Sequence, residues 1–135
     1  MSYRREIRIE FNHCDPAGIV FFPRYYEMAN SVIENFFRDA VGYPFERMMA
    51  EGAGSPTARI ETDFRAPSRL GEMIGWTLRL RRLGGSSATF EMRAEGGGVT
   101  RLITTHVLVW LTPAGRPGPW PDTIREKLAD MLETT

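Results

Sequence analysis

Residues 29–40 carry a wide apolar stripe with the spacing of one helix face. Apolar side chains recur there at intervals of three and four residues. They are Ala29, Val32, Ile33, Phe36, Phe37 and Ala40. Because proline fits the first turn of a helix and glycine favours its end, Pro23 and Gly42 predict the limits of this helix. A stripe this wide has to be covered by a second layer, which is the strongest constraint on the fold.

Alternating apolar and polar residues predict strands on both sides of this helix. Residues 4–11 alternate before it, with Phe11 at the end of the apolar face. Four alternating segments follow it, at 56–65, 74–80, 88–94 and 100–111. The last of these is the most apolar and is expected in the middle of the sheet. The short links at 83–87 and 96–98 favour an antiparallel sheet. Thr123 is expected to cap a final helix.

Length and charge limit the class of protein. The 135 residues are expected to form one α+β domain over the whole chain, 1–135. Lys plus Arg and Asp plus Glu both number 17, so the chain lacks the positive excess that nucleic-acid binding needs. The longest apolar runs, Ile19–Phe22 and Val107–Leu111, are far shorter than the roughly 20 residues of a membrane-spanning helix. One cysteine and no apolar leader predict a cytoplasmic protein.

Three chemically active side chains occupy successive positions at His13, Cys14 and Asp15. A cysteine nucleophile needs a base close by, but neighbours in extended chain point to opposite faces, so His13 is a poor partner. A catalytic zinc site takes three protein ligands, whereas the chain has two histidines and no HExxH or CxxC spacing. We therefore expect no metal site and interpret Cys14 as a small core residue.

Asp15 stands in a stiff turn just before the predicted helix. Pro16 fixes the backbone after it, and Gly18 permits a sharp turn. A helix N-terminus has free N–H groups and a partial positive charge, which polarise a carbonyl oxygen. A carboxylate beside it is the minimum needed to hydrolyse an activated acyl group. The residues alone leave an equal alternative, in which Asp15 only hydrogen-bonds its own backbone and caps the turn.

The segment EFNHCDPAGIVFFPRYY at 10–26 resembles the signature of the 4-hydroxybenzoyl-CoA thioesterase-like family of hotdog-fold acyl-CoA thioesterases. The matching elements are Asp15, Gly18, the apolar run Ile19–Phe22, Pro23 and Tyr25. The segments at 54–56, 63–72 and 83–91 also resemble this family. The resemblance implies a hotdog fold, in which an antiparallel sheet wraps around one long central helix.

The resemblance also implies roles for individual residues. Asp15 would act as nucleophile or as general base for water, and the backbone N–H of Phe22 would hold the thioester carbonyl. The implied substrate-binding residues are His13, Gly18, Tyr25, Thr57, Ser86 and Ser87. The substrate would be an acyl-CoA, hydrolysed without a metal or cofactor. The site would lie between the chains of a homodimer or homotetramer, with residues near Gly54–Thr57 supplied by the partner.

Two other functions remain open on the sequence. A non-catalytic module that binds acyl-CoA or acyl-carrier protein would keep the pocket without needing the carboxylate of Asp15. A hotdog dehydratase pairs an Asp with a His a few residues later, and no His follows Asp15 before His106. The dehydratase is therefore the weaker alternative.

Overall fold

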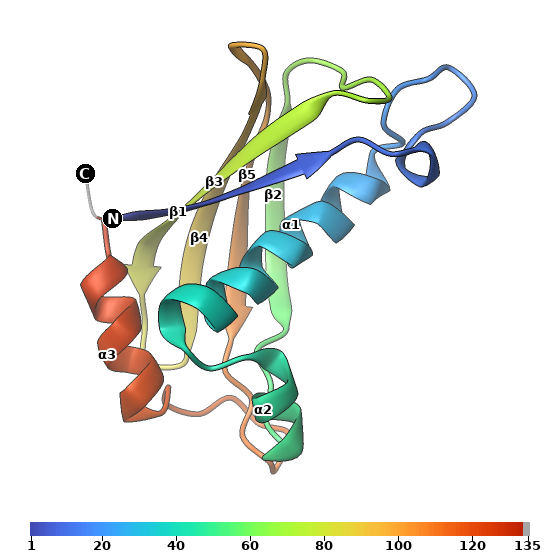
Figure 1. The fold of residues 1–135 in the computed structure, drawn as a ribbon. Helices are drawn as coiled ribbons and strands as arrows, with labels where there is room; N and C mark the ends of the chain where they lie inside the picture. The colour runs from blue at the N-terminus through green and yellow to red at the C-terminus, as the bar shows by residue number, and fades with distance from the viewer. Residues whose placement is uncertain (134–135) are drawn as a thin grey trace.

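The computed structural model describes residues 1–133 and combines one sheet with three α-helices (Figure 1). The chain forms a strand, a long helix, a short helix, four strands and a last helix. Their bounds are β1 Ser2–Arg8, α1 Pro23–Phe36, α2 Phe45–Ala50, β2 Thr57–Phe64, β3 Met73–Leu83, β4 Ser87–Gly96, β5 Val99–Val109 and α3 Asp122–Met131. The sequence pattern predicts each of these except α2.

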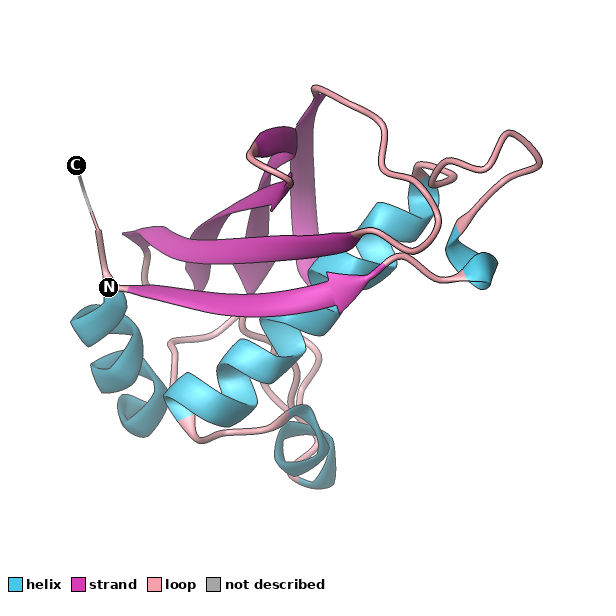
Figure 2. Ribbon diagram, turned by 45° about the horizontal axis from the view of Figure 1, so that its top comes forward, coloured by secondary structure: helices cyan, strands magenta, loops and turns pink. Residues whose placement is uncertain are grey.

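The sheet has five strands in the order β1-β3-β4-β5-β2, and every neighbouring pair is antiparallel. Helix α1 lies along one face of the sheet (Figure 2). This is the predicted α+β hotdog arrangement, in which the long helix is covered by the sheet. Strand β5 lies in the interior of the sheet, between β4 and β2, as its apolar sequence predicts.

The core lies between α1 and the sheet. Phe36 of α1 is fully buried, and its ring is 5.4 Å from that of Phe90 in β4 and 5.9 Å from that of Tyr3 in β1. The predicted stripe residues Ala29, Val32, Ile33 and Phe37 are also buried. The stripe therefore packs against the sheet as its spacing predicts.

The predicted limits of the long helix are confirmed. Pro23 is the first residue of α1, and Phe22 is the N-cap. After α1 the helical segment continues as a π-helical turn, Phe37–Val41. It ends at Gly42, whose φ of 73° is the left-handed conformation that glycine adopts easily. No helix within residues 1–133 is long and apolar enough to cross a membrane.

Two local predictions are wrong. Phe11 does not continue the apolar face of β1, because β1 ends at Arg8 and residues 11–13 form a 3₁₀ turn that leaves Phe11 84% exposed. Thr123 does not cap the last helix. Helix α3 begins at Asp122 after Pro121, so Thr123 already lies in its first turn.

Strand β2 forms a free edge whose inner face is only partly covered. Ile60 and Phe64 pair with His106 and Leu102 of β5, both buried, so they point to the side of the sheet that faces α1. They nevertheless remain 41% and 49% exposed. The alternation of this segment predicts the correct phase, but only the start of α1 reaches β2, where Tyr26 contacts Thr62 and Phe64.

Phe36→Ala should lower the free energy of unfolding by about 3–5 kcal/mol, because it removes a buried ring from a packed core. Phe11→Ala is a matched control at an exposed position and should change stability by less than about 0.5 kcal/mol. Urea unfolding followed by circular dichroism measures both. Similar losses in the two variants would contradict the placement of the core.

Candidate active site

The turn that carries Asp15 has the sequence of a type I turn, with Asp first, Pro second and Gly fourth. The N–H of Gly18 donates to the carbonyl of Asp15 at 2.9 Å, and the N–H of Asp15 donates to the carbonyl of Ile19 at 3.0 Å. Gly18 has a φ of 80°, so glycine is required to close the turn without strain. The sequence DPAG therefore folds this turn through local interactions.

The carboxylate of Asp15 is held by its own turn. Its Oδ1 accepts a hydrogen bond from the N–H of Ala17 at 2.9 Å, which is the turn-capping bond expected of an Asp in this position. No residue among 1–133 donates a hydrogen bond to its Oδ2. Because Asp15 is only half-buried, the carboxylate is fixed through one oxygen and offers the other.

The Asp15 turn is fastened to the segment at 66–72, which precedes β3. The N–H of Val20 donates to the carbonyl of Ser68 at 2.9 Å, and the N–H of Leu70 reaches the carbonyl of Gly18 at 3.4 Å. Ile19 and Arg69 form an isolated antiparallel bridge between the two segments. The position of Asp15 therefore depends on the position of residues 66–72.

The side chain of Arg101 in β5 holds residues 66–72 in place. Its guanidinium donates to both carboxylate oxygens of Glu72, at 3.0 and 2.9 Å, and to the carbonyls of Pro67 and Gly96, both at 2.9 Å. The side chain is only 8% exposed. The bonds from Arg101, followed by those from the N–H of Arg69, hold the pKa of Glu72 down to about 2.

Sequence reasoning missed the Arg101 cluster, although one signal was available. Arg101 is the single charged residue in the apolar strand TRLITTHVLVWL. A charged side chain in a buried strand has to be paired, so an acidic partner elsewhere in the chain is required. The sequence does not say which of the acidic residues that partner is.

Helix α1 begins at Pro23, five residues after the Asp15 turn ends at Gly18. The N–H of Phe22 has no acceptor among residues 1–133, and Pro23 has no N–H. The start of α1 thus leaves a free backbone donor seven residues after Asp15. The positive end of the α1 dipole also attracts the partial negative charge of an oxygen placed near this N–H.

A cavity of about 320 Å³ lies at this end of α1. Phe22 and Tyr25 line it, together with Ile19, Val20, Phe64, Arg65, Ala66 and Pro67. The hydroxyl of Tyr25 lies beside Ser68 and Arg101, and burial raises the pKa of Tyr25 above its ordinary value. The ring of Phe64, at the end of β2, is 6.1 Å from that of Phe22 and 6.0 Å from that of Tyr25.

The remaining residues implied by the resemblance are dispersed within one chain. Thr57 begins β2 and is separated from Phe64 by about 23 Å of extended strand. Ser87 pairs with Val109 at the same end of the sheet as Thr57, and the carbonyl of its neighbour Ser86 accepts from the N–H of Trp110. The ring of His13 lines a separate cavity, and its Nδ1 accepts from the N–H of Glu10 at 2.8 Å.

Cys14 does not have the surroundings of a nucleophile. Its Sγ points to the carbonyl of Glu10 at 3.6 Å, and Nδ1 of His13 already accepts a hydrogen bond from the N–H of Glu10. Within residues 1–133 no group of three or more His, Cys, Asp and Glu side chains is placed to hold a metal ion.

A chain of polar side chains runs beneath the start of α1. The hydroxyl of Tyr26 donates to Thr62 of β2 at 3.1 Å, Thr62 is 2.7 Å from Thr104, and Thr104 is 3.1 Å from Nε2 of His106. Burial lowers the pKa of His106 to about 4, so this imidazole is neutral at pH 7. These side-chain contacts connect β2, β5 and α1 without introducing a charge.

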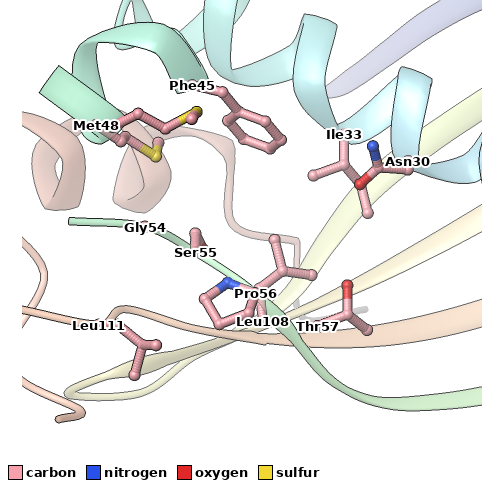
Figure 3. Close-up of a pocket in the computed structure, with 11 residues that line it drawn as sticks. Asn30, Ile33, Phe45, Met48, Gly54, Ser55, Pro56, Thr57, Leu108 and Leu111 are labelled. Carbon is pink, nitrogen blue, oxygen red and sulfur yellow. The ribbon is translucent and has the colours of Figure 1, made fainter. Parts of the chain in front are cut away.

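A second, larger cavity of about 370 Å³ lies toward the other end of α1 (Figure 3). It opens between α1 and α2 on one side and the ends of β2 and β5 on the other. Its lining consists of Asn30, Ile33, Phe45, Met48, Met49, Gly54, Ser55, Pro56, Thr57, Leu108 and Leu111. Of the implied site, Thr57 and the preceding residues Gly54, Ser55 and Pro56 belong to it.

Comparison with known proteins identifies the family of this fold and site. A family model described as thioesterase-like superfamily matches residues 9–128, which is most of the chain. The chain belongs to the thioesterase-like superfamily. The region that contains the Asp15 turn and α1 thus belongs to the part shared with this superfamily.

Individual relatives agree with this membership in the thioesterase-like superfamily. The 4-hydroxybenzoyl-CoA thioesterase of Pseudomonas sp. (strain CBS-3) is 36% identical over 65 residues, which are 47% of this chain and 46% of the relative. The match therefore spans about half the length of that curated relative. A thioesterase from Thermus thermophilus, solved with coenzyme A and zinc, is 27% identical over 95% of this chain and 92% of its own, with a TM-score of 0.82.

The fold of this superfamily recurs at lower identity. A 1,4-dihydroxy-2-naphthoyl-CoA thioesterase from Synechocystis is 16% identical and has a TM-score of 0.89 over 97% of this chain and 98% of its own. This likeness supports the hotdog fold alone.

Glu72→Gln should lower the free energy of unfolding at pH 7 by about 1–3 kcal/mol, less than for a fully buried pair because Glu72 is partly exposed. The pKa of Glu72, about 2 when folded, lies below its ordinary 4.5, so the pair stabilises the fold above pH 4.5 and loses this effect as the pH falls toward 2. The difference in stability between the two proteins should therefore shrink from pH 4.5 to 3 and disappear only near pH 2.

Urea unfolding at pH 7, 4.5 and 3 measures this difference. Glu95→Gln is the control, because Glu95 meets Arg93 only at 3.8 Å on the surface. A Glu72→Gln deficit that stays constant across the three pH values would rule out the ion pair as its cause.

Proposed function

We propose that the protein is an acyl-CoA thioesterase, which converts R–CO–S–CoA and water into R–COOH and CoA–SH. The observations that carry the proposal are the carboxylate of Asp15, fixed through one oxygen, and the free N–H of Phe22 seven residues later at the start of α1. Membership in the thioesterase-like superfamily and the curated 4-hydroxybenzoyl-CoA relative support it.

In the proposed reaction the two groups have separate tasks. The free Oδ2 of Asp15 attacks the thioester carbonyl or removes a proton from the attacking water, while its Oδ1 stays bound to the N–H of Ala17. The N–H of Phe22 and the α1 dipole stabilise the negative charge that develops on the carbonyl oxygen. A thioester is already activated, so the proposal includes no resident metal or cofactor, and CoA leaves as the thiol.

The proposed active unit is a homodimer, with a tetramer of two such dimers as a larger form. The support is β2, a free edge whose inner face exposes Ile60 and Phe64. Antiparallel pairing of β2 with the same strand of a second copy extends the sheet and places the end of one strand beside the start of the other. Thr57 of one chain then adjoins Phe22 and Phe64 of the other, which joins the dispersed site residues.

Asp15→Asn should reduce kcat/KM for acyl-CoA hydrolysis by at least about 100-fold without loss of folding, because the amide neither attacks nor accepts a proton. Cys14→Ser, one residue away, is the matched control and should keep most of the activity. Release of free thiol from a panel of aromatic and aliphatic acyl-CoAs measures both, and circular dichroism checks the fold.

The same panel separates the proposal from the binding-module alternative. Turnover by the wild type that persists in Asp15→Asn would exclude Asp15 as the catalytic group. Absence of turnover on every thioester, with acyl-CoA still bound, would favour the non-catalytic module.

Ile60→Lys should shift the protein toward the monomer and reduce activity in parallel, because a charge on a free edge opposes strand pairing. Val99→Lys is the control, since Val99 is 49% exposed on a strand that is already paired. Sedimentation velocity at micromolar concentration measures the assembly. A wild type that sediments as a monomer while fully active would overturn the dimer proposal.

A further inference from the structure

The cavity beside α2 is polar at one end and apolar at the other. Asn30 of α1 and Thr57 of β2 stand at one end, whereas Met48 and Leu111 stand at the other (Figure 3). Met49, next to Met48 in α2, also lines the cavity. Asn30 lies about 10 Å along α1 from Pro23, and its side chain has no hydrogen-bond partner among residues 1–133. This gradient suits a ligand with a polar head and a long apolar tail.

The volume of the cavity exceeds what one aromatic ring fills. A cavity of about 150 Å³ is enough for a benzene molecule. The cavity here measures about 370 Å³, so a single-ring acyl group would leave much of its wall without contacts. A longer acyl chain makes those contacts along its whole length.

The lining also favours a flexible ligand. Met48 and Met49 come from α2, and the ring of Phe45, from the same helix, lies between Met48 and α1 (Figure 3). Methionine side chains are unbranched and adapt to chains of different shape. No charged side chain lines the cavity, so nothing in its lining favours an ionised acyl tail.

The position of the cavity matches the proposed dimer. Thr57 lies at its polar end, and the proposed antiparallel pairing of β2 would bring Phe64 and the start of α1 of the second copy next to Thr57. A thioester held by one chain would therefore direct its acyl tail into the cavity of the other.

From these observations we infer that the cavity binds the tail of a medium-length aliphatic acyl-CoA, a substrate class that differs from the one-ring acyl group named for the curated relative. This inference rests on the proposed thioesterase function. The residues that set the chain length are Met48, Met49 and Leu111, at the apolar end.

The first test compares acyl-CoAs of increasing length. In the wild type, kcat/KM should rise about two- to fourfold for each added methylene from acetyl-CoA to octanoyl-CoA, because each methylene leaves water for the apolar wall. Octanoyl-CoA should also exceed 4-hydroxybenzoyl-CoA by about tenfold or more.

The second test places a charge at the apolar end. Met49 is 76% exposed, so Met49→Glu should fold normally and lower the ratio of octanoyl-CoA to acetyl-CoA activity by about tenfold. Ala50→Glu is the matched control, because it adds the same charge to the next residue of α2, which is exposed and does not line the cavity. Its ratio should stay within about twofold of the wild type.

The outcomes separate this inference from the proposed function. Hydrolysis that is fastest on 4-hydroxybenzoyl-CoA and does not rise with chain length would overturn the inference and leave the thioesterase function standing. Absence of hydrolysis on every substrate would overturn the function. In that case, isothermal titration calorimetry of the protein with octanoyl-CoA and with acetyl-CoA decides whether the cavity still selects the longer tail. Equal affinities for the two ligands would overturn the inference too.

Discussion

The ion pair of Arg101 and Glu72 is the contact on which the site depends most. A guanidinium buried in β5 has to find acceptors, and here it donates to Glu72, to three backbone carbonyls and to Ser68. These bonds fix residues 66–72, whose backbone in turn holds the Asp15 turn. The position of Asp15 therefore depends, through residues 66–72, on Arg101 in an interior strand of the sheet.

The two interpretations of Asp15 that the sequence leaves open are compatible. Its Oδ1 caps the turn, as a structural aspartate does, while its Oδ2 has no donor among the described residues. The capping bond sets the direction in which the second oxygen points. A carboxylate held in this way meets a substrate without first having to be ordered, which is an advantage for a group that reacts.

Local chemistry explains what the sequence predicts well. Pro23 and Gly42 mark the helix limits because their backbone preferences act within a few residues, and DPAG closes its turn for the same reason. The failures depend on contacts distant in sequence. Phe11 leaves the apolar face where the chain departs from β3, and the partner of Arg101 lies 29 residues before it. Helix α2 is too short for its periodicity to stand out.

In the proposed dimer, the partly uncovered inner face of β2 would link folding to assembly. A single chain leaves Ile60 and Phe64 in contact with water, so part of the apolar surface that would stabilise the fold is not yet buried. A second copy that covers them adds its binding free energy to the folding free energy. Thermal stability then becomes a function of protein concentration, and dilution alone would lower the melting temperature without any change in the sequence or the solvent.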